Sequence, residues 1–203
     1  MDREKIILDA AKSCYLRFGV EKTAMTDIAA ESGISRATIY RCYASADDIF
    51  MAVLARESAE MTRDANQHLK RFTDPRDHIV EGMMFCLDEV PRRPLHAHFF
   101  QSESKTWATL RAMPADALHQ MCVENLGASL GLHSIPDHVD AKSLDHLAEL
   151  IMRLLMSYTM APSHRARNSE EMRAMLHAIL DPIVSSLVGL PTRSALAAVR
   201  KKR

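Results

Sequence analysis

The sequence predicts an all-α protein of 203 residues, with an N-terminal three-helix domain that contains a helix-turn-helix and a larger helical domain behind it. Composition favours helices, because there are only 6 glycines and 8 prolines, while alanine, leucine, methionine and glutamate are frequent. Apolar residues make up 47% of the chain, which is enough to build a hydrophobic core. In addition, apolar residues recur at helical spacings of three and four in one segment after another.

The first three predicted helices are short, and each has a recognisable end. The first is predicted from one stripe of apolar residues spaced by four, three and four positions: Ile7, Ala11, Cys14 and Phe18. It ends at Gly19. The second is predicted to begin at the N-cap residue Thr26 and to stop at Gly33, which allows the positive φ of a sharp turn. Ser35 is the expected N-cap of a third helix that runs to about Tyr43.

Four further helices are predicted in the middle of the chain. Ser45 and Asp48 stand three residues apart and form a capping box that begins a fourth helix, over about residues 47–71. The fifth begins at the segment TDPRD and ends where Pro91 and Pro94 interrupt the helical pattern. Residues from about 96 to 111 and from about 114 to 131 are expected to form the sixth and seventh.

The last two predicted helices have the most regular apolar spacing. It alternates between three and four positions, which is typical of helices that pack lengthwise. The residues are Leu144, Leu147, Ile151, Leu154 and Tyr158 in one helix, and Leu176, Leu180, Ile183, Leu187 and Leu190 in the other. Either a core within one chain or pairing with a second copy in a four-helix bundle explains this pattern. For the second explanation, we take all of them except Leu190 as the candidate dimer interface.

The second of these helices has Asn168 as its predicted N-cap and contains Pro182 in its interior. A proline there should cost roughly 3 kcal/mol or mark a kink.

Charge is unevenly distributed, although the formal net charge is zero. Residues 1–46 have seven basic and six acidic side chains, a net charge of +1, whereas residues 47–192 have 14 basic and 20 acidic ones, a net charge of −6. Residues 193–203 have five basic and no acidic side chains and are expected to form a flexible tail. We predict that residues 1–46 form the N-terminal helix-turn-helix domain, residues 47–192 the larger helical domain and residues 193–203 the tail. Because an acidic body repels a polyanion, such a partner is expected to bind at an end of the chain.

Several classes of protein are not indicated. The four cysteines form no CxxC pair, the N-terminus has no signal-peptide pattern, and no apolar run of about 18 residues could span a membrane. We therefore expect a reduced, cytoplasmic protein without a membrane contact. No glycine-rich phosphate loop, catalytic carboxylate pair or nucleophile motif is present, so we expect neither an enzyme nor a bound cofactor.

The second and third helices, joined through Gly33, form a predicted helix-turn-helix. A purely structural hairpin is one explanation. The side chains left outside favour DNA binding, because small residues allow close approach, hydroxyls bind phosphates and arginine hydrogen-bonds guanine edges or phosphates. The start of the second helix is where this motif meets the DNA backbone. The candidate DNA-binding residues are Lys22, Thr23, Thr26, Ser35, Arg36, Ala37, Thr38, Tyr40 and Arg41.

Many motifs agree at once with one known family. They are the aromatic–Gly end of the first helix, Thr-x-x-Ile-Ala, Gly-hydrophobic-Ser, Thr-Ile-Tyr, and an aromatic residue followed by Ser-x-acidic-acidic. With these motifs, residues 6–54 resemble the N-terminal domain of the TetR family of transcriptional repressors. The resemblance implies an all-α homodimer that binds a double-stranded DNA operator. It also implies a C-terminal domain that binds a small effector, which releases the protein from DNA.

By position, the resemblance implies that Tyr40 contacts a phosphate and that Thr26 touches the DNA backbone while capping its helix. The residues that it implies lie in the major groove are Arg36, Ala37, Thr38 and Arg41. Tyr43 takes the place of a family phenylalanine and is expected to lie mostly in the core.

Three residues depart from the family pattern. Ala37 replaces a frequent glycine, Cys42 a frequent histidine, and Ala46 a frequent phosphate-binding lysine. The loss of one phosphate contact should lower the slope of log affinity against log salt by about 0.9. The basic residues 200–203 could compensate, although a solvated tail is the simpler explanation.

Soft apolar side chains are frequent in the middle helices and suit either a packed core or a pocket for a hydrophobic effector. The candidate pocket residues are Met84, Phe85, Phe99, Phe100, Trp107, Met121, Met152 and Met156. One alternative function is a dimerising helical adaptor with little DNA binding. Another is a regulator that responds to redox through Cys42 or to metal through histidines, although the histidines form no helical i, i+4 ligand pair and no metal site is expected.

Overall fold

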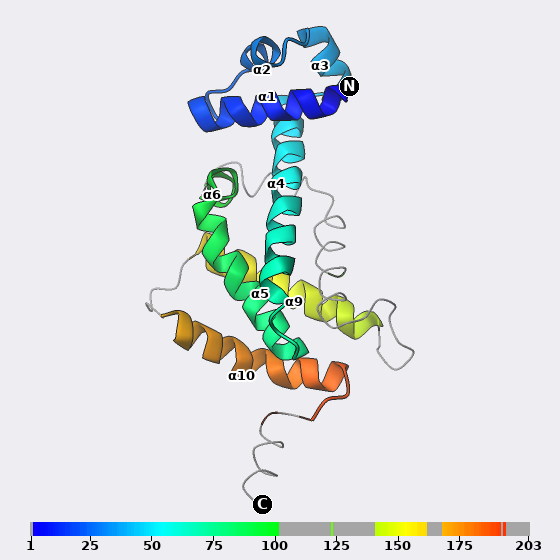
Figure 1. Ribbon diagram of the computed structural model, residues 1–203, viewed down its shortest axis with the longest axis vertical. Coiled ribbons are helices and arrows are strands. Elements are labelled where there is room, and N and C mark those ends of the chain that lie inside the picture. The colour runs from blue at the N-terminus through cyan, green and yellow to red at the C-terminus, as the bar shows by residue number, and fades with distance from the viewer. Residues whose placement is uncertain (1, 102–122, 124–140, 162–167, 192, 194–203) are drawn as a thin grey trace, which may run out of the picture. The chain divides into compact units, whose positions relative to one another are not determined.

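The computed structural model describes residues 2–101, 123, 141–161, 168–191 and 193, and every regular element within them is a helix (Figure 1). The predicted all-α fold is thereby confirmed. The chain divides into two compact units, one of residues 1–64 and 91–102 and the other of residues 65–90 and 103–203. The first unit thus contains more than the three helices expected in residues 1–46. Most of the predicted sixth helix, all of the predicted seventh except residue 123, and the basic tail beyond Arg193 lie outside the described residues.

Helix α1 (Arg3–Phe18) packs against α2 (Met25–Ser32) in the first unit. Ile7, Ala11 and Cys14 are fully buried, as their spacing predicts. The prediction that Phe18 belongs to the same buried stripe is wrong, because its ring is 46% exposed and lies under the guanidinium of Arg17 at 4.5 Å. The buried aromatic side chain at this end of α1 is Tyr15.

The turn between α2 and α3 (Arg36–Cys42) is made by Gly33, whose φ of 67° lies in the left-handed region that glycine adopts without strain. Ser35 caps α3 as predicted, because its Oγ accepts the amide N–H of Thr38 at 3.3 Å. The predicted N-cap Thr26 is wrong, since the helix begins one residue before it and the cap position is Ala24.

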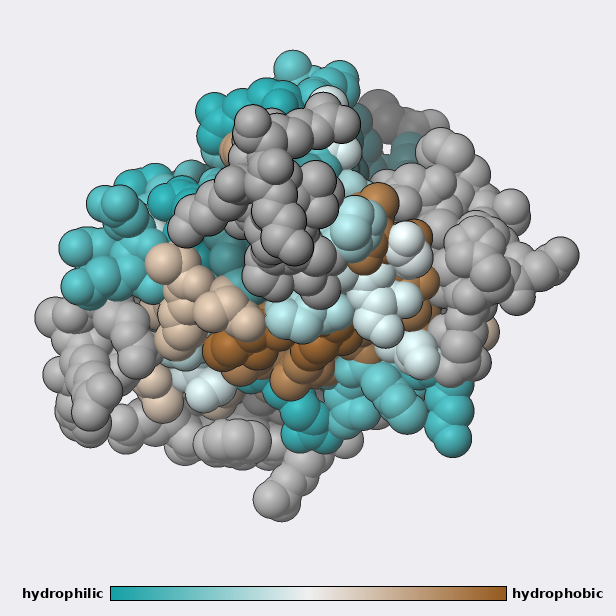
Figure 2. All heavy atoms as spheres, turned by 90° about the horizontal axis from the view of Figure 1, so that it is seen from below, coloured by the Kyte–Doolittle hydropathy of each residue, from teal (hydrophilic) through white to brown (hydrophobic). Residues whose placement is uncertain are grey.

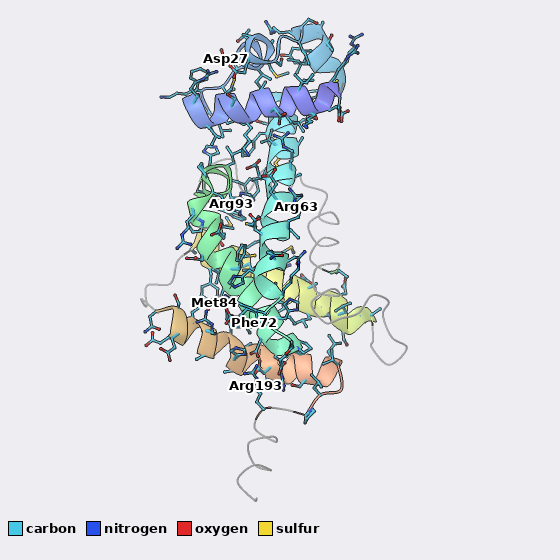
Figure 3. All side chains as sticks on the ribbon, viewed as in Figure 1. Asp27, Arg63, Phe72, Met84, Arg93 and Arg193 are labelled. Carbon is cyan, nitrogen blue, oxygen red and sulfur yellow. The ribbon has the colours of Figure 1, made fainter. Side chains whose placement is uncertain are left out.

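The reason for the earlier start of α2 is the carboxylate of Asp27, at the N-terminal end of the helix in Figure 3. Its Oδ2 accepts the amide N–H of Ala24 at 2.8 Å. This bond satisfies the amide of the cap residue itself, and the amide of Asp27, which a capping hydroxyl would accept, donates instead to the carbonyl oxygen of Ala24 at 3.0 Å.

Helix α4 (Ala46–Leu69) is the longest described helix, and its capping box is confirmed. The amide of Asp48 donates to Ser45 Oγ at 3.1 Å, and the amide of Ser45 donates to Asp48 Oδ2 at 2.9 Å. Ion pairs from Lys12 to Glu57 at 2.6 Å and from Arg56 to Asp9 at 2.7 Å join α4 to α1. The N-terminal part of α4 is therefore fixed to the three-helix domain.

Helix α6 (Pro94–Gln101) also belongs to the first unit, and Pro94 occupies its first position. The ring of His96 is buried, with Nε2 3.1 Å from Ser58 Oγ on α4. Its Nδ1 is buried without a hydrogen-bond partner. His98 lies edge-on to Phe50 with ring centroids 5.9 Å apart, so two histidines of α6 contact α4.

The second unit contains α5 (Pro75–Glu89), α9 (Ala141–Met160) and α10 (Ser169–Leu187), and a 3-10 helix (Val90–Arg92) follows α5 where the chain passes back to the first unit. The predicted N-cap Asn168 is confirmed, since its Oδ1 accepts the amide N–H of Glu171 at 2.8 Å. Helix α10 continues through Pro182, which is exposed. These three α-helices share one core: Ile79, Val80, Met83, Leu144, Leu147, Ala148, Leu176, Leu180 and Val184.

Candidate nucleic-acid interface

Helix α3 is fixed to the first unit by one side chain and presents the others. Ile39 is fully buried, while Arg36, Ala37, Tyr40 and Arg41 are exposed. With 3.6 residues per turn, Ala37 and Arg41 lie on the side of the helix opposite Ile39. The helix therefore presents a small residue and an arginine at the centre of its open face.

Three polar side chains of this helix are joined by hydrogen bonds. Ser35 Oγ lies 3.0 Å from Thr38 Oγ1, and either hydroxyl can be the donor. Arg41 Nη2 donates to Thr38 Oγ1 at 3.0 Å. The guanidinium is thereby drawn back along the helix toward its N-terminal end, the end that contacts base edges in helix-turn-helix proteins.

On the other flank, the guanidinium carbon of Arg36 lies 6.0 Å from the centre of the Tyr40 ring. The side chain of Tyr40 is 46% exposed, so its hydroxyl is open to a partner. A phenol hydroxyl beside an arginine can bind a phosphate oxygen, since both groups donate hydrogen bonds.

The candidate residues near α2 differ in their accessibility. Lys22 is exposed, and Thr26 is exposed at the second position of the helix. Thr23 is buried, and its hydroxyl donates to the carbonyl oxygen of Gly19 at 2.8 Å. The hydroxyl proton of Thr23 is thus engaged within the turn, so Lys22 and Thr26 are the more accessible of the three.

The start of α4 contributes little positive charge to this surface. Ala46, which stands where the family often has lysine, is the half-buried first residue of the helix. Asp47 and Asp48 follow it in the first turn. Two carboxylates near a polyanion disfavour binding, although the carboxylate of Asp48 is engaged in the capping box.

A polar contact that the sequence does not reveal holds α2 on α1. Glu31 accepts hydrogen bonds from Arg17 Nη2 at 2.6 Å and from Ser13 Oγ at 2.8 Å. These two bonds hold the pKa of Glu31 below its usual value. Residues 13, 17 and 31 have no spacing that would indicate the contact, since it depends on how the two helices cross.

Aromatic packing beneath the DNA-binding helices was also not predicted. The ring of Tyr15 lies edge-on to Phe50, with centroids 5.7 Å apart. Its hydroxyl is buried without a hydrogen-bond partner, and burial, followed by the nearby charge of Asp47, raises the pKa of Tyr15. Tyr43 is half-buried rather than fully buried, and burial raises its pKa as well.

The candidate effector residues occur in both units. In the first, Phe99 is buried and its ring centroid lies 5.1 Å from that of Phe100. In the second, the ring of Phe85 lies 5.2 Å from that of His68. Trp107 and Met121 lie outside the described residues.

The candidate methionines of the second unit are half-buried rather than enclosed in the core. Met84 packs against the shared core of α5, α9 and α10, and Figure 3 marks it on α5. Met152 and Met156 follow one turn apart on α9. These side chains retain accessible surface within their own unit.

The candidate dimer residues fall into two groups. Four of them are buried in the core of the single chain, as the intramolecular explanation of their spacing requires: Leu144, Leu147, Leu176 and Leu180. Partly buried are Ile151, Leu154, Tyr158 and Leu187. Ile183 is 41% exposed, and beside it on α10 the sequence analysis missed Ile179, which is 45% exposed.

Among the described cysteines, Cys42 is exposed on α3 and Cys86 is half-buried. Cys14 is buried, and burial raises the pKa of its thiol. Within the part of the chain that the structure describes, no three histidine, cysteine or acidic side chains are placed to hold a metal ion. No described helix is long and apolar enough to cross a membrane.

Comparison with known sequences supports the interpretation of the helix-turn-helix. Residues 7–53 match the family described as bacterial regulatory proteins, tetR family. Rv1255c of Mycobacterium tuberculosis, an uncharacterized HTH-type transcriptional regulator, is 26% identical over 179 residues, which cover 88% of this chain and 84% of that protein. YfiR of Bacillus subtilis, with the same description, is 38% identical over 52 residues, or 26% of this chain and 25% of YfiR.

Among solved structures, the chain is similar to the TetR family repressor AlkX from Dietzia sp. strain DQ12-45-1b, which is implicated in biodegradation of n-alkanes. The TM-score is 0.66 at 18% identity, and the match covers 90% of this chain and 98% of AlkX. At this identity the likeness establishes the fold, an N-terminal helix-turn-helix domain followed by a helical domain.

Proposed function

We propose that this chain, which belongs to the TetR family of DNA-binding transcriptional regulators and is not an enzyme, acts as a dimeric repressor that a small hydrophobic effector releases from its operator. The observation that carries the proposal is the exposed face of α3, which presents Arg36, Tyr40 and Arg41 while Ile39 holds the helix on its domain. In a dimer, two such helices enter successive major grooves about 34–36 Å apart on a near-palindromic operator.

Dimer formation is supported by the apolar face of α10 that the single chain leaves open. Ile179 and Ile183 are one helical turn apart, and Leu190 beyond the helix is 38% exposed. Figure 2 shows apolar side chains gathered on one face of the molecule between hydrophilic ones. A large exposed apolar patch marks an interaction surface, and a second copy of α10 is the partner that a two-fold dimer supplies.

The proposed effector is hydrophobic because the available side chains are. Met84, Met152 and Met156 are half-buried, and methionine adapts its shape to varied apolar ligands. An effector that binds the released state more tightly than the DNA-bound state shifts the population toward release. Helix α4 is the route that we propose for this coupling, since its residues 46–64 belong to the first unit and 65–69 to the second.

DNA binding is tested by selecting bound sequences from a random pool with the full-length chain, then measuring their affinity at several salt concentrations. The expected outcome is a near-palindromic sequence whose affinity falls steeply with salt. Repression is tested by placing that sequence between a promoter and a reporter gene. Failure to bind any DNA at low salt would favour the alternative function, a dimerising adaptor.

The effector class is tested by thermal shift of the chain against lipids, acyl thioesters, apolar drugs, anions and metal salts. Apolar compounds are expected to raise the melting temperature and to dissociate the complex with the selected DNA. If only anions or metals raised it, the hydrophobic effector would be wrong while the DNA-binding function would stand.

A further inference from the structure

Helix α3 contains two arginines in different surroundings. Arg36 lies beside the ring of Tyr40, whereas Arg41 is hydrogen-bonded to Thr38 Oγ1 at 3.0 Å. Thr38 in turn lies 3.0 Å from Ser35 Oγ. We call Ser35, Thr38 and Arg41 the polar array of α3. It consists of one continuous chain of hydrogen bonds along the exposed side of the helix.

An inventory of protons shows what the polar array offers to a partner. The two hydroxyls have two protons, and one of them is used in the bond between Ser35 and Thr38. Ser35 Oγ also accepts the amide of Thr38, and Thr38 Oγ1 also accepts from Arg41. Three of the four hydroxyl lone pairs are therefore occupied, whichever hydroxyl donates. One hydroxyl proton and the other N–H groups of Arg41 remain, so the array chiefly donates.

A donating array selects a base edge that accepts. In the major groove, guanine presents two acceptors, N7 and O6, whereas adenine pairs its N7 with a donor and cytosine presents a donor. Arg41 Nη2 has a second N–H besides the one bonded to Thr38, and Nη1 has two more. Together they can donate to N7 and O6 of the same guanine.

The position of Arg41 on the helix suits this contact. Arg41 and Ala37 lie opposite the buried Ile39, and both are exposed. Ala37 is one turn before Arg41, and its single methyl group leaves space for a base edge beside the guanidinium.

We propose that Thr38 is a positioning residue that holds Arg41 for donation to a guanine, so that each operator half-site has a guanine opposite Arg41. This inference rests on the proposed function, because it assigns a base to the DNA-binding face of α3. Arg36, beside Tyr40, contributes affinity and not this preference.

The test uses the full-length chain and the DNA sequence selected with it. Affinity is measured by fluorescence anisotropy for four duplexes that differ only in the base pair opposite Arg41. The unmodified chain is expected to prefer guanine by about 5- to 150-fold, the range of one good bidentate contact. Thr38→Val keeps the branched shape but removes the acceptor, and should reduce that preference several-fold, whereas Thr38→Ser should retain it.

Two variants of the arginines complete the design. Arg41→Lys keeps the charge but removes the planar fork, so it should lose the guanine preference and keep its salt dependence. Arg36→Ala is the matched control, expected to weaken binding to all four duplexes equally. Thermal melting of each variant establishes that it is folded, and Thr38→Ala, which also removes the acceptor, replaces Thr38→Val if that variant does not fold.

The inference is overturned if a folded variant that lacks the Thr38 hydroxyl keeps the guanine preference, or if Arg41→Lys keeps it. It is also overturned if Arg41→Lys weakens all four duplexes equally, which would make Arg41 a phosphate contact. Failure of the unmodified chain to bind DNA would overturn the proposed function along with it. DNA binding that does not depend on the base opposite Arg41 would overturn this inference alone.

Discussion

Replacing Ile179 and Ile183 by serine should separate the proposed dimer without unfolding the chain. In the single chain, these side chains are 45% and 41% exposed, so a partner could bury that remaining surface. Full burial of an isoleucine contributes about 1.5 to 3 kcal/mol, which gives about 0.6 to 1.3 kcal/mol for the exposed part of each. The fold should survive, because Leu176, Leu180 and Val184 form the buried side of α10.

Symmetry doubles the effect on dimer formation. In a two-fold dimer each residue occurs in both copies, so the two substitutions together should weaken association by roughly 3 to 5 kcal/mol. Because 1.4 kcal/mol corresponds to a factor of ten, the dimer dissociation constant should rise by roughly a hundredfold to several thousandfold.

Sedimentation over a range of concentrations measures this constant directly. Leu16→Ser is the matched control, because Leu16 is a 54% exposed leucine on α1 and lies outside the proposed interface. The control should sediment as the unmodified chain does. A double variant with an unchanged dissociation constant, or an unmodified chain that stays monomeric at micromolar concentration, would refute the assignment of α10 to the interface.

Three further predictions concern the first unit. Ile39→Ala should lower the free energy of unfolding by about 2 to 5 kcal/mol in urea titration, because Ile39 is fully buried; an unchanged midpoint would contradict its role in holding α3. Tyr40→Phe should weaken binding to every DNA sequence by a similar factor, about 12- to 150-fold for one hydrogen bond to a charged phosphate, as titrations with specific and random duplexes would show; a loss confined to the specific duplex would contradict a phosphate contact. Burial, followed by the charge of Arg93, lowers the pKa of His96 below its ordinary value of 6.5, so the unfolded chain binds that proton more readily. Stability from neutral His96 is thus present above pH 6.5 and is lost as pH falls below it, by at most about 1.4 kcal/mol per pH unit. In urea titrations from pH 5 to 8, the free energy of unfolding should therefore depend less steeply on pH for His96→Leu than for the unmodified chain. Equal slopes would contradict this prediction.

Local signals in the sequence predicted much of the first unit. Gly33 and the caps at Ser35 and Ser45 are confirmed, because each involves groups within three or four residues of one another. Thr26 was assigned wrongly as a cap, because the sequence does not show that Asp27 satisfies the amide of Ala24. Contacts that depend on how helices cross could not be predicted at all, such as the one between Arg17 and Glu31.

Helix α10 shows a second limit, because apolar residues occur on two of its sides. The regular alternation of three and four positions places Ile183 with Leu176 and Leu180 in a single stripe. In the structure, the buried apolar residues are instead Leu176, Leu180 and Val184, spaced by four, and Ile183 is exposed. Periodicity alone could not decide which side faces α5, since either choice buries isoleucine, leucine or valine.

Polar pairs between α5 and α10 explain which side is buried. Arg173 forms an ion pair with Glu81, His177 lies 3.6 Å from Asp77, and the buried Arg76 donates to Ser185 Oγ at 3.4 Å. Residues 173, 177 and 185 are separated by four and eight positions, so they lie on one side of α10, next to the buried leucines and valine.

Turning α10 to bury Ile179 and Ile183 instead would separate these pairs and take Arg173 away from the carboxylate of Glu81, which is only 11% exposed. Breaking a fully buried ion pair costs about 3 to 5 kcal/mol, and less here, because the side chain of Arg173 is 38% exposed. Burial of the two isoleucines, at about 1.5 to 3 kcal/mol each, would not offset this cost, because the same turn would expose Leu176, Leu180 and Val184. The polar pairs therefore make the burial of Leu176, Leu180 and Val184 the preferred arrangement, and the isoleucine side of α10 is left for a partner.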